Sequence, residues 1–94
     1  MSGIKGRLQA SQDVTLTVNA GLTNKVIWNI SGFAGCTFLG ATATIKAVEL
    51  SWDTQVTLIV SYEANGDIML RVKSDKAQTL IVHVVAEFNK TVAV

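Results

Sequence analysis

The sequence predicts an all-β protein that folds as a small antiparallel β-sandwich or jelly-roll-like domain. Apolar and polar residues alternate with a period of two through the long apolar segments, as they do in strands that bury one face. These segments recur about every 8 to 12 residues, a spacing typical of sandwiches and barrels. The chain has no proline, and glycine, asparagine, aspartate and serine supply its turns, as in short hairpins.

The chain is long enough for one domain, which is expected to span residues 1–94. Residues 1–6 are small and polar enough to form an extended N-terminal arm. They and the residues after them lack the apolar core of a secretory signal. No run of about 18 apolar residues predicts a membrane helix. We therefore expect neither a signal peptide nor membrane insertion.

The expected strands follow one another along the chain, with a turn at 20–24 and a glycine-containing break at 31–35. Residues 40–50 are ambiguous, because their alanines suit a helix while their β-branched residues favour a strand. No capping box supports the helix. The expected strand segments are 7–10, 14–18, 25–30, 36–39, 40–50, 56–63, 68–73 and 80–88.

The hairpin between Gln55 and Ser74 is the clearest of these elements, and its register can be derived. A two-residue turn at Asn65-Gly66 would place apolar residues of one strand opposite charged residues of the other, and so mix the two faces. A three-residue loop that begins at Ala64 instead places all the large apolar residues on one face. We therefore predict the three-residue loop, with Gly66 in the left-handed conformation.

The composition indicates that the protein assembles. Hydrophobic residues make up 49% of the chain and charged residues 16%, against a typical charged share of about 25%. A small monomer of this composition leaves apolar surface in water, and burial between subunits removes it. The alternative is a regular two-sheet core with an exterior of threonine, serine and asparagine.

The interface candidates lie on strand faces that would otherwise contact water. The last strand buries one face, and its second face still carries Ile81, His83 and Val85. Ile59 lies on the corresponding face of the central hairpin. These four residues are the predicted oligomer interface. The alternative is burial against the domain's other sheet or against a loop.

The residues that usually carry catalysis are sparse. Cys36 is the only cysteine and His83 the only histidine, so a typical zinc site cannot be built. The acidic residues lie mostly in or beside predicted turns, and no nucleophile elbow or phosphate loop is present. The net charge of +1 gives no general attraction for nucleic acid. We therefore expect no enzyme activity, metal, cofactor or nucleic-acid partner, and we expect Cys36 to be a dispensable buried thiol.

Trp52 is the candidate ligand-binding residue. It lies in a predicted turn between Ser51 and Asp53, where its ring would reach the surface. Trp28 alternates with apolar neighbours and is expected in the core. A carbohydrate-binding module with Trp52 as a surface platform is therefore an alternative function, and a small hydrolase is the least supported class.

The order of segments resembles the small β-sandwich domains of phage virion proteins, at tail-fibre or needle tips and in decoration proteins. The resemblance covers residues 13–88 and follows the segments DVTLTVNAG, VIWNISGFAG, the hairpin around NGDI, and TLIVHVVAEF. It implies a non-enzymatic structural or adhesion component of a virion, made in the host cytoplasm. It also implies a homo-oligomer, with a trimer favoured, and contacts with other virion proteins or a surface glycan. The chain lacks a fibrous shaft, so a free-standing decoration protein stays open beside a fibre tip.

Overall fold

The protein is all-β, as the sequence predicts. The computed structural model describes residues 4–50 and 53–92, and most of these residues lie in strands. A single turn of 3-10 helix, η1 (Ile30–Gly32), is the only helical element in these residues. The strands are β1 (Ile4–Val18), β2 (Gly21–Asn29), β3 (Cys36–Val48), β4 (Val56–Tyr62), β5 (Asp67–Ser74) and β6 (Gln78–Val92).

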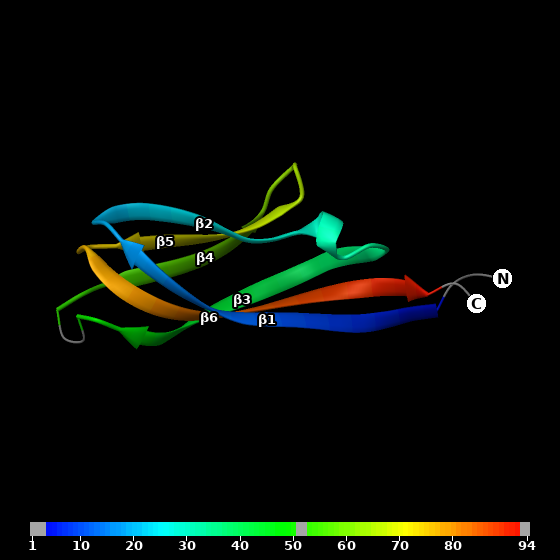
Figure 1. Cartoon of the computed structure of the whole chain (residues 1–94), viewed down its shortest axis with the longest axis horizontal. Helices are drawn as coiled ribbons and strands as arrows, with labels where there is room; N and C mark the ends of the chain where they lie inside the picture. The colour runs from blue at the N-terminus through cyan, green and yellow to red at the C-terminus, as the bar shows by residue number, and fades with distance from the viewer. Residues whose placement is uncertain (1–3, 51–52, 93–94) are drawn as a thin grey trace.

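The six strands form two antiparallel sheets of three strands that pack against each other (Figure 1). Sheet A has the order β1-β6-β3 and sheet B the order β2-β5-β4. Each sheet therefore takes its central strand from the C-terminal half of the chain. Successive strands change sheets at every connection except the β4–β5 hairpin, and this winding is jelly-roll-like.

The molecule is elongated, with extents of 57 × 23 × 15 Å. The paired strands β1 and β6 extend beyond sheet B, and β1 begins at the end of the molecule where β6 finishes (Figure 1). Ile4–Gly6, expected as part of an arm, are paired with β6. Met1–Gly3 lie outside the described residues.

Three expectations about strand boundaries are corrected. Residues 7–10 and 14–18 belong to one strand, because β6 pairs with β1 without interruption. Residues 36–39 and 40–50 likewise form one strand up to Val48, with two bulges that absorb its irregular pattern. The turn expected at 20–24 ends earlier, since β2 begins at Gly21, whose φ of +104° suits the tight connection from β1.

The core lies between the inner faces of the two sheets. Alternate residues of the central strands β5 and β6 are fully buried, which confirms the period-two pattern of both segments. Trp28 packs against the core, as expected. The buried apolar residues are Val14, Leu16, Val18, Ile68, Leu70, Val72, Leu80, Val82, Val84, Ala86 and Phe88.

An aromatic cluster forms the core beneath η1. Phe88 of β6 is fully buried and stacks on Phe33, with 4.3 Å between the ring centroids. Phe38 of β3 meets Phe88 edge-on at 5.8 Å, and Trp28 meets Phe33 edge-on at 6.4 Å. These stacked and edge-on contacts add to the hydrophobic stabilisation of the rings. The segment after β2 is thereby anchored over sheet A.

The β4–β5 hairpin has the predicted register. Val60 lies opposite Leu70, and Leu58 lies opposite Val72. The Glu63 amide donates to the Asp67 carbonyl at 2.8 Å, which closes the three-residue loop. Gly66 has a φ of +92°, as the bulged loop requires.

Gly66 is also in contact with a distant segment. The Ile30 amide donates to the Gly66 carbonyl at 2.8 Å, and Asn29 Nδ2 donates to Asp67 Oδ1 at 2.7 Å. A Cβ atom on Gly66 would lie 2.6 Å from Ile30 Cγ2. The hairpin tip therefore packs on the start of η1, at a separation that only glycine allows.

Candidate functional site

The outer face of sheet A carries three of the four predicted interface residues. Ile81 and Val85 are half-buried, and the His83 side chain between them is 43% exposed. All three project from β6, the central strand, so strands β1 and β3 flank them on both sides. Ile81 lies between Thr15 and Ala47. Small and hydroxyl-bearing neighbours thus cover part of this face within a single chain.

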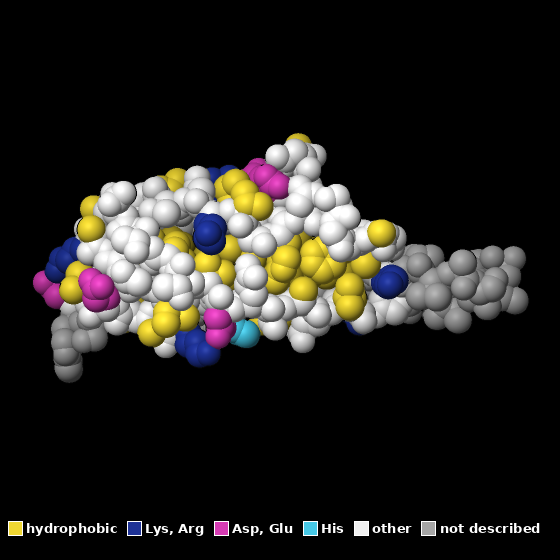
Figure 2. All heavy atoms as spheres, viewed as in Figure 1, with side chains coloured by type: hydrophobic (Ala, Val, Ile, Leu, Met, Phe, Trp, Pro, Cys, Tyr) yellow, Lys and Arg dark blue, Asp and Glu magenta, His cyan; other side chains and the backbone are white. Residues whose placement is uncertain are grey.

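A polar bridge crosses all three strands of sheet A at His83. His83 Nδ1 lies 2.7 Å from Asp13 Oδ1 on β1, and Lys46 Nζ of β3 donates to Asp13 Oδ2 at 2.7 Å. Figure 2 shows the histidine beside an acidic and a basic side chain at the lower rim of the molecule. The Lys46 hydrogen bond, and then that of His83, hold the pKa of Asp13 below its ordinary value of 3.8. Asp13 is therefore an anion at neutral pH and orients His83.

We expect this bridge to stabilise the fold in a pH-dependent way. A carboxylate whose pKa is lowered by folding adds stability above its unfolded pKa and loses it as the pH falls through its folded pKa. Asp13→Asn should therefore unfold more easily than the parent at pH 7, and the difference should shrink once the pH falls below about 4. Urea unfolding at a series of pH values measures this.

Lys46→Met is the matched variant for that experiment, because the Lys46 hydrogen bond is the largest cause of the lowered Asp13 pKa. It should reproduce part of the loss at neutral pH. A difference between Asp13→Asn and the parent that stays constant from pH 7 to pH 3 would contradict the role given to the carboxylate.

A shallow hollow of about 430 Å³ lies further along the same outer face. It is lined by Val85 and Gly40 and by three polar side chains, those of Gln9, Thr42 and Glu87. The hollow adjoins the β3 bulge between Phe38 and Gly40. Sequence reasoning missed this feature, although a glycine inside a strand pattern is a recognised signal for a bulge.

The outer face of sheet B carries the most exposed aliphatic side chains. Ile59 of β4, the fourth predicted interface residue, is 56% exposed. Leu22 and Val26 of β2 are 62% and 46% exposed. Sequence reasoning missed Leu22 because it fell in a predicted turn. These residues alternate with polar and basic side chains, so the face is amphipathic.

Hydrophobic side chains also gather where β3 begins beside η1 (Figure 2). Tyr62, at the end of β4, is 48% exposed and stacks on Phe38 with 5.0 Å between ring centroids. Leu39 is exposed as well. The edge of the sandwich formed by β3 and β4 is therefore apolar at the end nearest η1.

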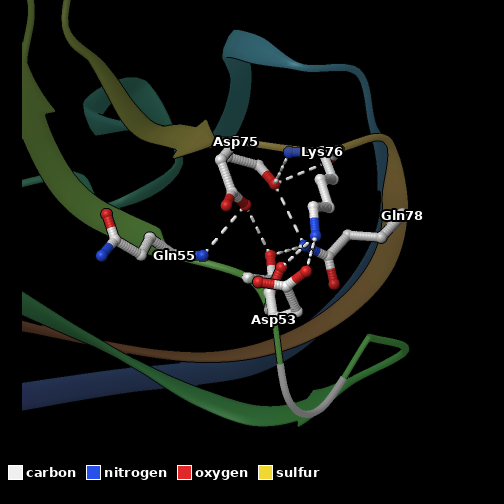
Figure 3. A network of polar contacts seen from close by, with 7 residues as sticks. Asp53, Gln55, Asp75, Lys76 and Gln78 are labelled. Atoms are coloured by element: carbon white, nitrogen blue, oxygen red, sulfur yellow. Dashed lines mark hydrogen bonds and ion pairs between the residues drawn. The ribbon is translucent and has the colours of Figure 1, made fainter.

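The opposite end of sheet B is closed by a polar network that joins the connection before β4 to the β5–β6 connection (Figure 3). Asp75 Oδ1 accepts from the Thr54 hydroxyl at 2.7 Å and from the Gln55 amide at 2.9 Å, and these bonds lower the Asp75 pKa. Lys76 Nζ donates to Asp53 Oδ2 at 2.7 Å. Asp53 and Asp75 therefore stabilise these two connections through their hydrogen bonds and ion pair. Trp52, the predicted ligand platform, lies outside the described residues.

Cys36 is half-buried, and its Sγ lies 3.8 Å from the Ala34 carbonyl oxygen. It packs against the aromatic cluster. Within residues 4–50 and 53–92, no three histidine, cysteine, aspartate or glutamate side chains gather closely enough to hold a metal ion. The same residues contain no helix of the length and hydrophobicity needed to cross a membrane.

Comparison of the chain with protein-family models, with curated protein sequences and with solved structures gave no match.

Proposed function

We propose that this protein is a non-enzymatic structural or adhesion component of a phage virion, a decoration protein or a tail-fibre-tip-like protein. It acts through assembly with copies of itself and through surface binding. The observation that carries the proposal is the exposure of Leu22, Ile59 and Val26 on the outer face of sheet B. The segment order that resembles virion β-sandwich domains supports the virion setting.

The physical argument concerns the cost of exposed apolar surface. Full burial of one such aliphatic side chain stabilises by about 1.5 to 3 kcal/mol. With only 16% charged residues, the chain has few groups that favour a solvated exterior. Contact between subunits removes this surface from water, and repetition around a symmetric ring multiplies the gain. A trimer is the form favoured by the resemblance.

The virion setting fixes the expected partners and location. The protein is made in the host cytoplasm and joins the particle through other virion proteins. Ile81, His83 and Val85 on sheet A and Ile59 on sheet B are the candidate contact residues. The outer faces of the two sheets point in opposite directions. One outer face can therefore contact other copies of the protein while the other contacts the particle or a receptor.

Charge placed on the sheet A surface tests its role in assembly. We expect the double variant Ile81→Lys with Val85→Lys to sediment as smaller species than the parent, because desolvating two ammonium groups in an interface is costly. Sedimentation velocity measures the species, and circular dichroism checks the fold.

The matched control is Ala34→Lys with Ala77→Lys, which adds the same charge at two exposed loop positions. It should keep the parent's mass. A folded Ile81→Lys, Val85→Lys protein with the parent's mass would show that this face of β6 does not lie between subunits.

A carbohydrate-binding module is the second candidate function. The hollow beside Gly40 favours it, because an amide, a hydroxyl and a carboxylate from Gln9, Thr42 and Glu87 are groups that hydrogen-bond sugar hydroxyls. Trp52 is its other predicted ligand contact. Binding to a glycan array that is lost in Trp52→Ala would favour this function. Association with particles without glycan binding would favour the virion component.

A further inference from the structure

Strand β4 leaves one edge of sheet B open. It pairs only with β5, and the pairing from Val56 to Tyr62 has no shift of register. A regular strand at the edge of a sheet presents a row of unpaired backbone groups to any strand that can align with it. The edge of β4 is therefore a place where another strand can add to sheet B.

The hairpin register identifies the backbone groups that face this open edge. Glu63 donates to the Asp67 carbonyl and Gln55 accepts from the Asp75 amide, so these two residues turn their groups toward β5. Hydrogen-bonded and non-hydrogen-bonded positions alternate along an antiparallel pair. The residues whose amide and carbonyl groups face the open edge are consequently Val56, Leu58, Val60 and Tyr62.

The other edges carry features that discourage pairing. Strand β2 has a register shift between Val26 and Trp28, and its Lys25 lies opposite the buried Leu70. Strand β3 has two register shifts. Strand β1 carries Arg7 and further charged residues. Bulges and charges are the usual devices that protect sheet edges. Among the six described strands, β4 is the only one without a charged residue.

The sequence of β4 is close to palindromic in chemical character. It reads VTLIVSY, with Ile59 at the centre. On either side of Ile59 lie an aliphatic residue, then a hydroxyl residue, then a large apolar residue. Two copies aligned antiparallel about Ile59 would therefore match like with like along the whole strand.

We propose that β4 pairs with β4 of a second copy of this chain, antiparallel and about a two-fold axis at Ile59. Leu58 of one copy then lies opposite Val60 of the other, and Val56 opposite Tyr62. These are the residues whose backbone groups face the edge, so each such pair exchanges two hydrogen bonds. The two copies of sheet B become one continuous sheet, and the exposed Ile59 side chains meet at the axis.

The β4 pairing adds to the proposed function a specific contact, a register and a symmetry. In a two-fold contact the same surface of each copy meets the other. The near-palindromic sequence of β4 suits such a contact, because the strand then pairs with itself in reverse. The β4 contact uses an edge of sheet B, whereas the predicted contacts of Ile81 and Val85 use the outer face of sheet A. Both contacts can be made at once, in which case trimers would pair through β4.

A cross-linking experiment tests the register. In a Cys36→Ser background, Ile59→Cys places one thiol on the axis of the pair. Directly opposite residues of a non-hydrogen-bonded pair have Cα atoms about 4.5 Å apart, within the range that a disulfide spans. At about 10 µM protein, we expect the covalent dimer to form at least about tenfold faster than through random collision, because paired thiols have a millimolar effective concentration.

Ala77→Cys in the same background is the matched control, since Ala77 is exposed, lies in the connection between β5 and β6 and belongs to none of the proposed contacts. It should cross-link at the rate of random collision. An Ile59→Cys protein that cross-links no faster than Ala77→Cys overturns the edge pairing. If the parent is then still an oligomer by sedimentation, the proposed assembly function stands without it. A monomeric parent overturns both.

Discussion

Gly66→Val is expected to lower the free energy of unfolding by about 3 kcal/mol or more. The glycine has a φ of +92°, a region that β-branched residues tolerate poorly. Its missing side chain also makes room for Ile30, whose Cγ2 would lie 2.6 Å from a Cβ atom at this position. The two penalties add, because one is local to the backbone and the other is a contact with a distant segment. Urea unfolding followed by circular dichroism measures the loss.

Alanine substitutions at Gly21, Gly40 and Gly66 separate the backbone penalty from the penalty of the contact with Ile30. Gly21 has a φ of +104° but open space around it, so Gly21→Ala should show only the backbone cost. Gly40 has open space and no positive φ, so Gly40→Ala should be close to neutral. Gly66→Ala should exceed both. A Gly66→Val protein that unfolds at the parent's urea concentration would contradict the bulged loop and its packing on η1.

Phe88→Ala is expected to destabilise the protein by about 3 to 5 kcal/mol. Phe88 is fully buried and lies at the centre of the aromatic cluster, in contact with Phe33 and Phe38. Its removal leaves a cavity between β6 and the segment after β2, which the surrounding rings fill only in part. Thermal and urea unfolding would both report the loss.

Phe38→Ala is the matched control, because Phe38 belongs to the same cluster but is only half-buried. It should cost clearly less than Phe88→Ala. Phe88→Leu should recover much of the stability, since most of the volume is restored. Equal losses for the two alanine variants would show that Phe88 is not the centre of the cluster.

The register of the central hairpin could be predicted from the sequence because the choice of loop length has two consequences, and both favour the three-residue loop. Only the three-residue loop places Val60 opposite Leu70 and keeps Arg71 on the other face. Local sequence could not reveal that the same loop packs on Ile30, which is a contact between residues far apart in the chain. The reason for glycine at position 66 is thus partly local and partly tertiary.

The strand boundaries that sequence reasoning missed depend on pairing partners. Residues 4–18 look interrupted because Ser11, Gln12 and Asp13 break the apolar alternation. They form one strand because β6 offers a partner along all of it. The strand character of residues 40–50 has the same origin, since β3 pairs with the central strand of sheet A.

The candidate surfaces could be predicted in part. The exposure of Ile59 follows from the alternation of the hairpin. The half-burial of Ile81 and Val85 depends on which strands flank β6, and no local sequence pattern predicts that strand order. The hollow at Gly40 depends on a bulge whose partner strand is likewise distant in sequence.

The mass of the parent protein in solution tests the central claim most directly. Sedimentation equilibrium at micromolar concentration should give a species of at least two chains, each of 10.0 kDa. The proposed contacts through the outer face of sheet B and through the edge of β4 both predict such an assembly. A single 10.0 kDa species at that concentration would contradict the account.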